Sequence, residues 1–315
     1  MNIIYTGQKD DRLYKNVLGQ TIADILEHDE QSVYLDADLM SCIGTAKLPA
    51  ETPRAIDCGI AEANMAGIAC GLSAGGFRPI VHTFGPFASR RCYDQVFLSG
   101  GYAKNPITVI GSDPGITAAF NGGTHMPFED MALYRALPGA AVVDVTDITM
   151  LTYFLRFFQT QPGVKYLRVG RKESYPVYAP DTQFTPGQGA VLREGKDVLI
   201  VASGIMVHEA LQAANALAAD GIDAAVIDPV TVKPFDDALV RQYAEKTGAV
   251  VTAENHSKIG GLTSAVQNAL CGLQMRFGYV AVEDTFGEVG PQSYLRERFA
   301  LTDTHIAETV KHILA

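Results

Sequence analysis

Short runs of apolar and β-branched residues alternate with longer helix-like segments along this 315-residue chain. Helices separate the candidate strands, and strands joined in this way usually pair in parallel within one sheet. The pattern therefore predicts an α/β fold with mainly parallel sheets. Strands are predicted at residues 32–36, 79–83, 107–111, 141–144 and 165–168, and helices at 12–27, 61–74, 89–99, 128–135 and 148–160.

This alternation lapses between residues 171 and 189, where Tyr, Gln and Thr surround three prolines. Prolines without hydrophobic periodicity are typical of a semi-rigid linker that runs over a surface. A second α/β unit follows, with strands predicted at 198–202, 224–227 and 249–253 and a helix at 207–220. We therefore predict two domains, residues 1–180 and residues 188–315, each a mainly parallel sheet flanked by helices.

Composition excludes several classes of partner. The formal net charge of −10 argues against nucleic acid and against anionic membranes, both of which select basic surfaces. Residues 1–12 lack the pattern of a secretory signal, and the apolar runs are too short to span a bilayer. The five cysteines form no Cys-x-x-Cys pair, so neither a disulfide framework nor a metal site is predicted. A cytoplasmic protein is expected.

Glu62 is the only charged residue in the predicted helix at 61–74. It shares one helical face with Met65, Ala66 and Ala69, where a carboxylate is costly unless a partner offsets its desolvation. No cation close by in the sequence is an evident partner. The structural explanation is placement in the first helical turn, where the helix dipole favours an anion by about 0.3–1 kcal/mol; the alternative is a functional carboxylate.

Two further loops follow predicted strands, at the sheet edge where open α/β sheets bind ligands. Phe84 and Phe87 flank a Gly-Pro turn, where they could hold a flat ring between them or simply join the core. His125 follows a flexible Gly-Gly pair and directly precedes a helix start. A histidine in that place is a candidate for proton transfer or substrate binding, although many loop histidines are structural.

Four motifs in this order resemble the transketolase family, most closely the C-terminal half found in split transketolases and in deoxyxylulose-phosphate synthase. They read G-I-A-E-A-N-M, A-G-G-F-R-P-I-V, T-F-G-P-F-A-S-R-R-C-Y-D-Q and G-G-T-H-M-P-F-E-D-M-A-L-Y-R. The segments 227–236 and 254–262 of the second unit agree with the family as well. The resemblance implies a pyrimidine-binding domain followed by a transketolase C-terminal domain, and thiamine diphosphate as cofactor.

The resemblance also implies roles for particular residues. Glu62 would hydrogen-bond a pyrimidine ring nitrogen of the cofactor and act in catalysis with His125, which would contact the hydroxyls of the sugar. Phe84, Phe87 and Arg90 would lie at the cofactor, with Phe87 stacked on the pyrimidine. Arg168 would contact the phosphate of the sugar substrate.

At two of these positions the chain departs from the usual transketolase pattern. Asp113 stands where transketolases usually carry a histidine, and Asn121 stands where the family carries an aspartate. Both positions touch the sugar in the family, so the resemblance assigns them to substrate binding. An amide at position 121 can still accept or donate a hydrogen bond but carries no charge. The substrate could therefore be an unusual or modified ketose phosphate.

The Gly-Asp-Gly sequence by which the family holds Mg²⁺ and the cofactor's diphosphate occurs nowhere in the chain. The resemblance therefore implies a partner, an N-terminal transketolase subunit that carries the diphosphate and Mg²⁺ site, and a heterotetramer as the assembly. The predicted activity is transfer of a two-carbon ketol unit from a ketose phosphate to an aldose phosphate. Two alternatives remain, a synthase-like or 2-oxoacid-decarboxylating subunit and a non-catalytic scaffold. Lys233 and His256 are expected to be surface or interface residues.

Overall fold

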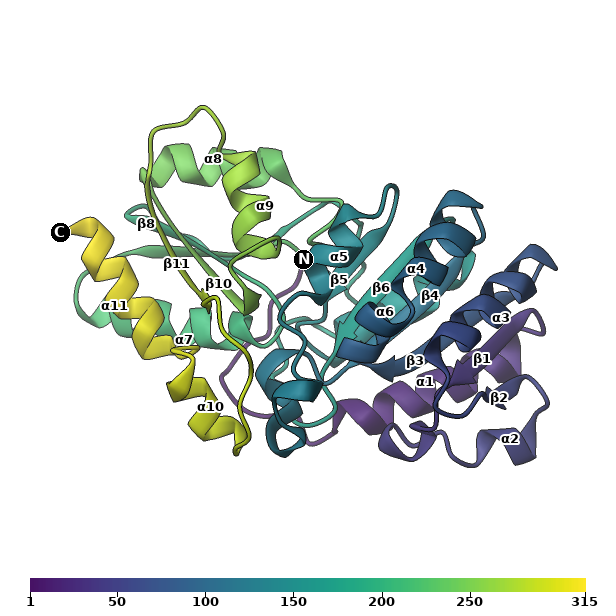
Figure 1. Cartoon of the computed structure of the whole chain (residues 1–315). Helices are drawn as coiled ribbons and strands as arrows, with labels where there is room; N and C mark the ends of the chain where they lie inside the picture. The colour runs from purple at the N-terminus through teal and green to yellow at the C-terminus, as the bar shows by residue number, and fades with distance from the viewer.

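Two sheets lying side by side organise the computed structural model, which describes residues 1–315 (Figure 1). The first sheet has the strand order β2-β1-β3-β4-β6-β5, and all its strands are parallel. The second has the order β11-β10-β8-β9-β7, in which only β7 runs antiparallel to its neighbour β9. The prediction of an α/β fold with two mainly parallel sheets is confirmed.

The strands of the first sheet are β1 (Ser32–Asp36), β2 (Ala55–Asp57), β3 (Arg78–Phe84), β4 (Ile107–Ser112), β5 (Ala141–Asp144) and β6 (Val164–Val169). Those of the second are β7 (Ala190–Arg193), β8 (Val198–Ala202), β9 (Ala224–Asp228), β10 (Ala249–Ser257) and β11 (Arg276–Val282). The sequence analysis predicted no strand at β2, β7 or β11. Two of these are short, and all three lie at or next to a sheet edge, where partial exposure weakens the hydrophobic signal.

Helices cover both faces of each sheet. On the first sheet, α1 (Tyr14–His28) and α6 (Ile148–Phe157) pack on one face, and α3 (Glu62–Ala74) and α5 (Asp130–Ala136) on the other. On the second sheet, α7 (Met206–Ala219) and α11 (Asp303–Leu314) share one face, opposite α8 (Asp237–Thr247) and α9 (Leu262–Ala269). The remaining helices are the short α2 (Leu48–Glu51), α4 (Tyr93–Gln95) and α10 (Gln292–Arg298).

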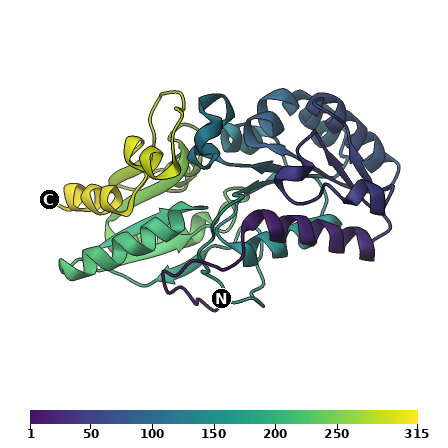
Figure 2. The same ribbon diagram turned by 90° about the horizontal axis from the view of Figure 1, so that it is seen from below.

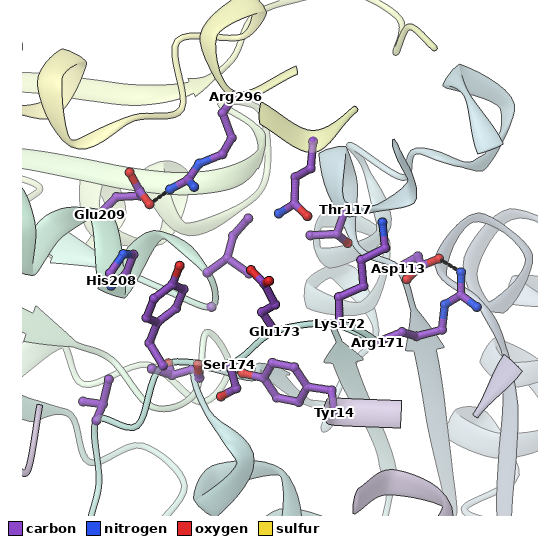
Figure 3. A pocket seen from close by; sticks show the side chains of 17 residues that line it. Tyr14, Asp113, Thr117, Arg171, Lys172, Glu173, Ser174, His208, Glu209 and Arg296 are labelled. Carbon is purple, nitrogen blue, oxygen red and sulfur yellow. Dashed lines mark hydrogen bonds and ion pairs between the residues drawn. The ribbon is translucent and has the colours of Figure 1, made fainter. Parts of the chain in front are cut away.

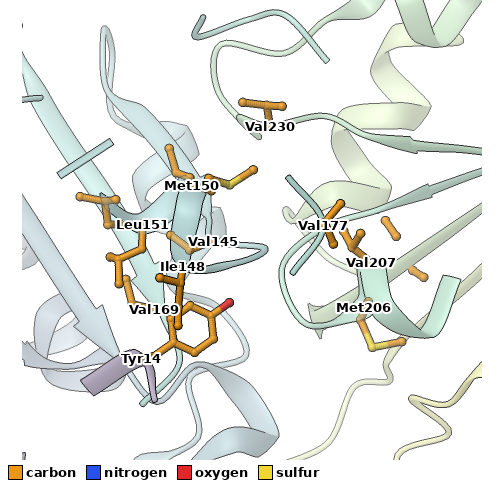
Figure 4. Close-up of a cluster of buried hydrophobic side chains, with 14 of the residues drawn as sticks. Tyr14, Val145, Ile148, Met150, Leu151, Val169, Val177, Met206, Val207 and Val230 are labelled. Carbon is orange, nitrogen blue, oxygen red and sulfur yellow. The ribbon is translucent and has the colours of Figure 1, made fainter. Parts of the chain in front are cut away.

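The largest hydrophobic core is continuous across the two units. It joins 54 buried residues, among them Ile148 and Leu151 from α6 and Met206 and Val207 from α7 (Figure 4). Two smaller cores fill the outer faces of the sheets. Viewed from below, α1 runs along the first sheet while the N-terminus lies beside the second unit (Figure 2). The two units therefore share one hydrophobic core and are packed against each other.

The segment after Arg171 is not the surface linker that its prolines suggested. Val177 and Tyr178 are buried in the shared core, and Phe184 stacks against Phe154 of α6. The carboxylate of Asp147, which caps α6, accepts the backbone N–H groups of both Val177 and Tyr178 at 2.9 Å. This prediction failed because hydrophobic periodicity reveals helices and strands but not an irregular segment held by side-chain acceptors. We propose that the domains divide between residues 180 and 188.

None of the helices has the length and apolar character needed to cross a membrane.

Candidate active site

The predicted ligand residues come together at the carboxyl edge of the first sheet, where β2, β3, β4 and β6 end. Phe84 is the last residue of β3, and Asp113 directly follows β4. Glu62 begins α3 after the short loop that leaves β2. Parallel strands end at the same edge, so segments far apart in sequence converge here.

Glu62 is buried, with 4 % of its surface exposed, and it does have a cationic partner. The Nη1 of Arg91 donates to the Glu62 Oε1 at 2.9 Å. The sequence analysis found no cation close to Glu62 along the chain, and this partner comes from a distant segment. Arg91 lies 29 positions away in sequence, and only the packing of α3 against the segment after β3 brings it to the head of the helix.

Phe84, Phe87 and His125 form one aromatic cluster. The His125 ring lies edge-on to both phenylalanines, with ring centroids 5.8 Å from Phe84 and 5.2 Å from Phe87. The guanidinium carbon of Arg91 stands 3.7 Å from the centroid of the Phe87 ring. The flat guanidinium group of Arg91 is thus stacked on Phe87 and hydrogen-bonded to Glu62 at the same time.

The segment that carries Phe87 and Arg91 departs from a regular α-helix. A helix was predicted at 89–99, but residues Phe87–Arg91 and Val96–Tyr102 are π-helical, with α4 between them. π-Helical turns are rare and occur frequently at functional sites. Here the wide turn places Phe87 and Arg91 so that the arginine folds back over the phenylalanine ring.

The loop from Asp113 to His125 is held by the second sheet. The side chain of Asn255 accepts the N–H of Ile116 at 3.0 Å and donates to the carbonyl of Pro114 at 2.9 Å. A side chain on Gly123 would meet the Gly287 carbonyl oxygen at 2.2 Å, so only glycine allows this contact. Asp113 and Ala119 adopt positive φ angles of 55° and 49°, conformations that strain a non-glycine residue. The second domain therefore fixes the loop that delivers His125.

Arg168 was predicted to contact the sugar phosphate, and this prediction is corrected. Its side chain is wholly buried within β6, with its Nε 2.8 Å from Asp130 and its Nη1 3.4 Å from Asp144. Its Nη2 also donates to the backbone carbonyl of Asn255 in the second sheet at 2.7 Å. Two carboxylates and two carbonyls, the second that of Pro127 at 3.2 Å, occupy this guanidinium, so it cannot reach a ligand at the sheet edge.

Arg171, which the sequence analysis missed, is the arginine that faces the cluster from the end of β6. It pairs with Asp113, and its guanidinium carbon lies 4.9 Å from the centroid of the Phe84 ring. Its Nε and the Asp113 Oδ1 have no hydrogen-bond partner. The sequence does distinguish the two arginines. Arg168 lies within the strand predicted at 165–168, whereas Arg171 follows that strand, in the position expected for a residue at the sheet edge.

Two predicted residues lie at the rim of the cluster. The Nε of Arg90 pairs with the Glu129 Oε1 at 3.0 Å, and its Nη2 reaches toward the Thr124 carbonyl. Arg90 thus braces the loop beside His125 and does not itself touch Phe87 or Glu62. Asn121 is exposed to solvent. Both residues remain accessible from the edge of the sheet.

A polar pocket between the two units adjoins this cluster (Figure 3). The Asp113–Arg171 pair closes one end of the pocket and the Glu209–Arg296 pair the other. His208 stacks on Tyr175 in its wall, with ring centroids 3.6 Å apart. Burial lowers the pKa of His208 to about 4, so this ring is neutral at physiological pH.

His256, expected at a surface or interface, is fully buried between the units beside Glu254. The Glu254 carboxylate accepts the N–H groups of Leu262 and Thr263 at 2.6 and 2.8 Å, which caps α9. Burial raises the pKa of Glu254 to about 7 and lowers that of His256 to about 4. Lys233, half-buried, donates to the carbonyls of Arg135 and Leu137 across the same interface.

Nowhere in the chain do three or more His, Cys, Asp or Glu side chains gather in a way that could hold a metal ion.

Comparison with known proteins identifies both units. Residues 11–175 match the pyrimidine-binding domain of transketolase, and residues 187–306 match the transketolase C-terminal domain. The chain is 45% identical over 310 residues to the 6-deoxy-6-sulfo-D-fructose transketolase subunit of Clostridium sp. (strain MSTE9), covering 96% of both proteins. It is 34% identical to 1-deoxy-D-xylulose-5-phosphate synthase 1 of Geobacter sulfurreducens, covering 96% of this chain but 48% of that enzyme.

A solved structure agrees with this assignment. A split-gene transketolase, crystallised as an inactive β4 tetramer, superposes with a TM-score of 0.85 at 37% identity. The match covers 95% of this chain and 96% of that one.

The buried Glu254 generates a prediction about stability against pH. Its pKa of about 7 in the folded chain exceeds the ordinary value of 4.5, so the unfolded chain loses this proton first as the pH rises. The contribution of protonated Glu254 to the free energy of unfolding is complete below pH 4.5. About 1–3 kcal/mol of it is lost as the pH rises through 7. Glu254→Gln should therefore gain stability relative to the wild type over that range.

Urea unfolding at pH 5, 6, 7 and 8 measures the gap between the two proteins. Glu308→Gln, which removes an exposed carboxylate from α11, is the control. A gap for Glu254→Gln that stays constant between pH 5 and 8 would contradict the prediction.

Proposed function

Because this chain belongs to the transketolase family, we propose that it is the C-terminal subunit of a two-chain transketolase, which transfers a two-carbon ketol unit from a ketose to an aldose. The observation that carries the proposal is the buried Glu62 carboxylate beside the Phe84, Phe87 and His125 cluster. A carboxylate at the head of a helix, next to an aromatic ring and open to one flat hydrogen-bonding group, is the half-site that an aminopyrimidine requires.

Arg91 supports the fit of the cofactor to these residues. Its planar guanidinium carries N–H donors, stacks on Phe87 and donates to Glu62. The aminopyrimidine of thiamine diphosphate is likewise planar and presents ring nitrogens and an amino group. The guanidinium is therefore a stand-in for that ring, and its contacts support the proposal that Glu62 and Phe87 hold such a group. In the proposed holoenzyme Arg91 gives up this place.

The residues of this chain then take separate tasks. When bound, thiamine diphosphate supplies the nucleophilic carbon through which the two-carbon unit is transferred. Glu62 holds a proton at the pyrimidine nitrogen and so orients the ring, while Phe87 stacks on its face. His125 binds a hydroxyl of the sugar and moves its proton. Asp113 and Asn121 contact further hydroxyls, and Arg90 holds the His125 loop through Glu129.

We propose that a second chain, an N-terminal transketolase subunit, completes the site and supplies the diphosphate and Mg²⁺ ligands, in a heterotetramer. Large apolar side chains remain exposed around the rim of the cluster, and exposed apolar patches mark binding surfaces. Ile60 is 74 % exposed, Phe120 71 % and Val289 67 %. All five cysteines are free, which supports a reducing, cytosolic compartment.

The substrate is proposed to carry an anionic group that Arg171 binds. Arg90, Arg91 and Arg171 each pair with a carboxylate at this edge, and Arg171 keeps an Nε donor without a hydrogen-bond partner. A ketose phosphate satisfies this requirement, and so does a sulfonate. The 45% identical relative named for 6-deoxy-6-sulfo-D-fructose favours the sulfonate as a second candidate.

A coupled assay tests the function directly. The chain is combined with an N-terminal transketolase subunit, thiamine diphosphate, Mg²⁺ and an aldose phosphate as acceptor, and is offered fructose 6-phosphate, 6-deoxy-6-sulfo-fructose and pyruvate in turn as donor. Ketol transfer without carbon dioxide release, only when both chains are present, is expected. Carbon dioxide release from pyruvate would instead favour the synthase-like or 2-oxoacid-decarboxylating alternative. A lack of any turnover with all three substrates would favour a scaffold.

Two variants separate the role of Glu62 from that of Arg91, because each breaks the ion pair between them. Glu62→Gln should lower kcat at least ~100-fold, because the catalytic proton transfer depends on this carboxyl. Arg91→Gln breaks the same ion pair but should retain turnover, because Arg91 only occupies the site in the cofactor-free chain. Steady-state kinetics and size-exclusion chromatography of the complex measure turnover and assembly. Full activity in Glu62→Gln would refute its catalytic role.

Arg171→Gln should raise KM for the anionic sugar by about 10–100-fold, since a charge-assisted hydrogen bond contributes roughly 1.5–3 kcal/mol. Arg296→Gln removes an arginine from the far end of the same pocket and serves as the matched control. Initial rates over a range of sugar concentrations separate KM from kcat. An unchanged KM in Arg171→Gln would show that another residue binds the anion.

A further inference from the structure

A second pocket opens at the opposite, amino-terminal edge of the first sheet. It lies among the first residues of β3, β4 and β6, the end of α3 and the segment 158–162. Its volume is about 420 Å³, within the range of roughly 300–1,000 Å³ that is usual for small-molecule sites. Glu62 and His125 lie at the other ends of these strands, so the pocket is separate from the candidate active site.

The lining of this pocket is positively charged. Its fourteen residues include Arg78 and Lys165 but no aspartate or glutamate, although the chain as a whole has a net charge of −10. Arg78 uses its Nη1 for Asp29, at 2.9 Å, and is otherwise partly open to solvent. A local excess of positive charge in an acidic protein attracts anions to that place.

Lys165 is the unusual member of this lining. Only 3 % of the residue is exposed, yet no carboxylate lies within 4 Å of its amine. Its one hydrogen-bond partner is the carbonyl of Gln161, at 2.8 Å, whereas an ammonium group has three hydrogens to donate. Burial without a counter-charge lowers the pKa of Lys165 to about 8. A buried cation without an anion is costly, and a bound anion would remove that cost.

We propose that this pocket binds the phosphate group of a small phosphorylated metabolite, with Lys165 as its main cation and Arg78 as the second. Neutral donors stand near both. Thr108 is the parallel partner of Lys165 on β4, and the amides of Gln159 and Gln161 line the same hollow. The three hydrogens of the ammonium and the remaining nitrogens of the guanidinium match the several acceptor oxygens of a phosphate.

Binding of a phosphate should be linked to protonation of Lys165. An adjacent anion favours the charged amine, so a proton is taken up when the anion binds near or above pH 8. The affinity therefore falls as the pH rises from 8 to 9.5, a range in which the charge of phosphate stays constant. Arg78, paired with Asp29, is the only other lining residue with a charged side chain, and the remaining lining residues carry no titratable side chain.

Isothermal titration of inorganic phosphate into the full chain tests this site. Every protein in this experiment carries Arg171→Gln, because that substitution removes the anion site proposed at the opposite edge of the sheet. Adding Lys165→Met should weaken phosphate binding at least ~10-fold and abolish the proton uptake at pH 8, measured in buffers of different ionisation enthalpy. Lys196→Met removes an exposed lysine from the second domain and should change neither quantity.

Undiminished binding in the Lys165→Met protein would overturn the proposal, as would the absence of phosphate binding in the Arg171→Gln background. If Lys165→Met does not fold, as judged by circular dichroism, Arg78→Gln at the pocket's mouth provides the same test with an expected loss of ~3–10-fold. Ribose 5-phosphate is titrated in parallel. Tighter binding than that of inorganic phosphate identifies a phosphate ester as the ligand, and equal binding identifies free phosphate. The result does not depend on whether the chain is a transketolase subunit.

Discussion

The buried guanidinium of Arg168 is the interaction on which the arrangement of the two sheets depends. It is wholly enclosed, and it reaches Asp130 of α5, Asp144 at the end of β5 and the backbone of Asn255 in β10. Asp144 in turn accepts a hydrogen bond from Ser203 of the second unit at 2.8 Å. Removal of one partner from a buried charge network typically costs about 3–5 kcal/mol, because the remaining charge is left unpaired. The same residues that stabilise the interface thus fix how the two sheets meet.

This network explains why the site depends on a domain that contributes little to its chemistry. The backbone carbonyl of Asn255 accepts from Arg168, and the side chain of the same residue holds the loop at Pro114 and Ile116. The close approach of Gly123 to Gly287 then fixes the next part of that loop. His125 is thereby placed against Phe84 and Phe87 by contacts that originate in the second sheet.

Much of the fold could be predicted from the sequence, because buried parallel strands and amphipathic helices leave clear periodic signals. The strands around Leu35, Val81 and Val109 are of this kind, and the ends of the latter two indicated where Phe84 and the His125 loop would lie. Glu62 follows β2, a strand that the sequence analysis did not predict. Pairings between distant positions leave no such signal. Arg91 with Glu62, Arg171 with Asp113 and the burial of Arg168 are all set by tertiary packing. The prediction of a surface linker around Tyr178 failed for the same reason, since the acceptor of this buried segment, Asp147, lies 31 residues earlier.

The position of Arg91 has a consequence for selectivity. A side chain tethered beside its own binding place competes with any incoming ligand at a high effective concentration. The observed affinity of a ligand is then its intrinsic affinity reduced by the fraction of molecules in which the arginine has moved away. Planar molecules that stack on Phe87 without hydrogen-bonding Glu62 recover only part of what the guanidinium loses. Under the proposed function, a ligand therefore binds only when its own contacts with Phe87 and Glu62 outweigh those of the Arg91 guanidinium.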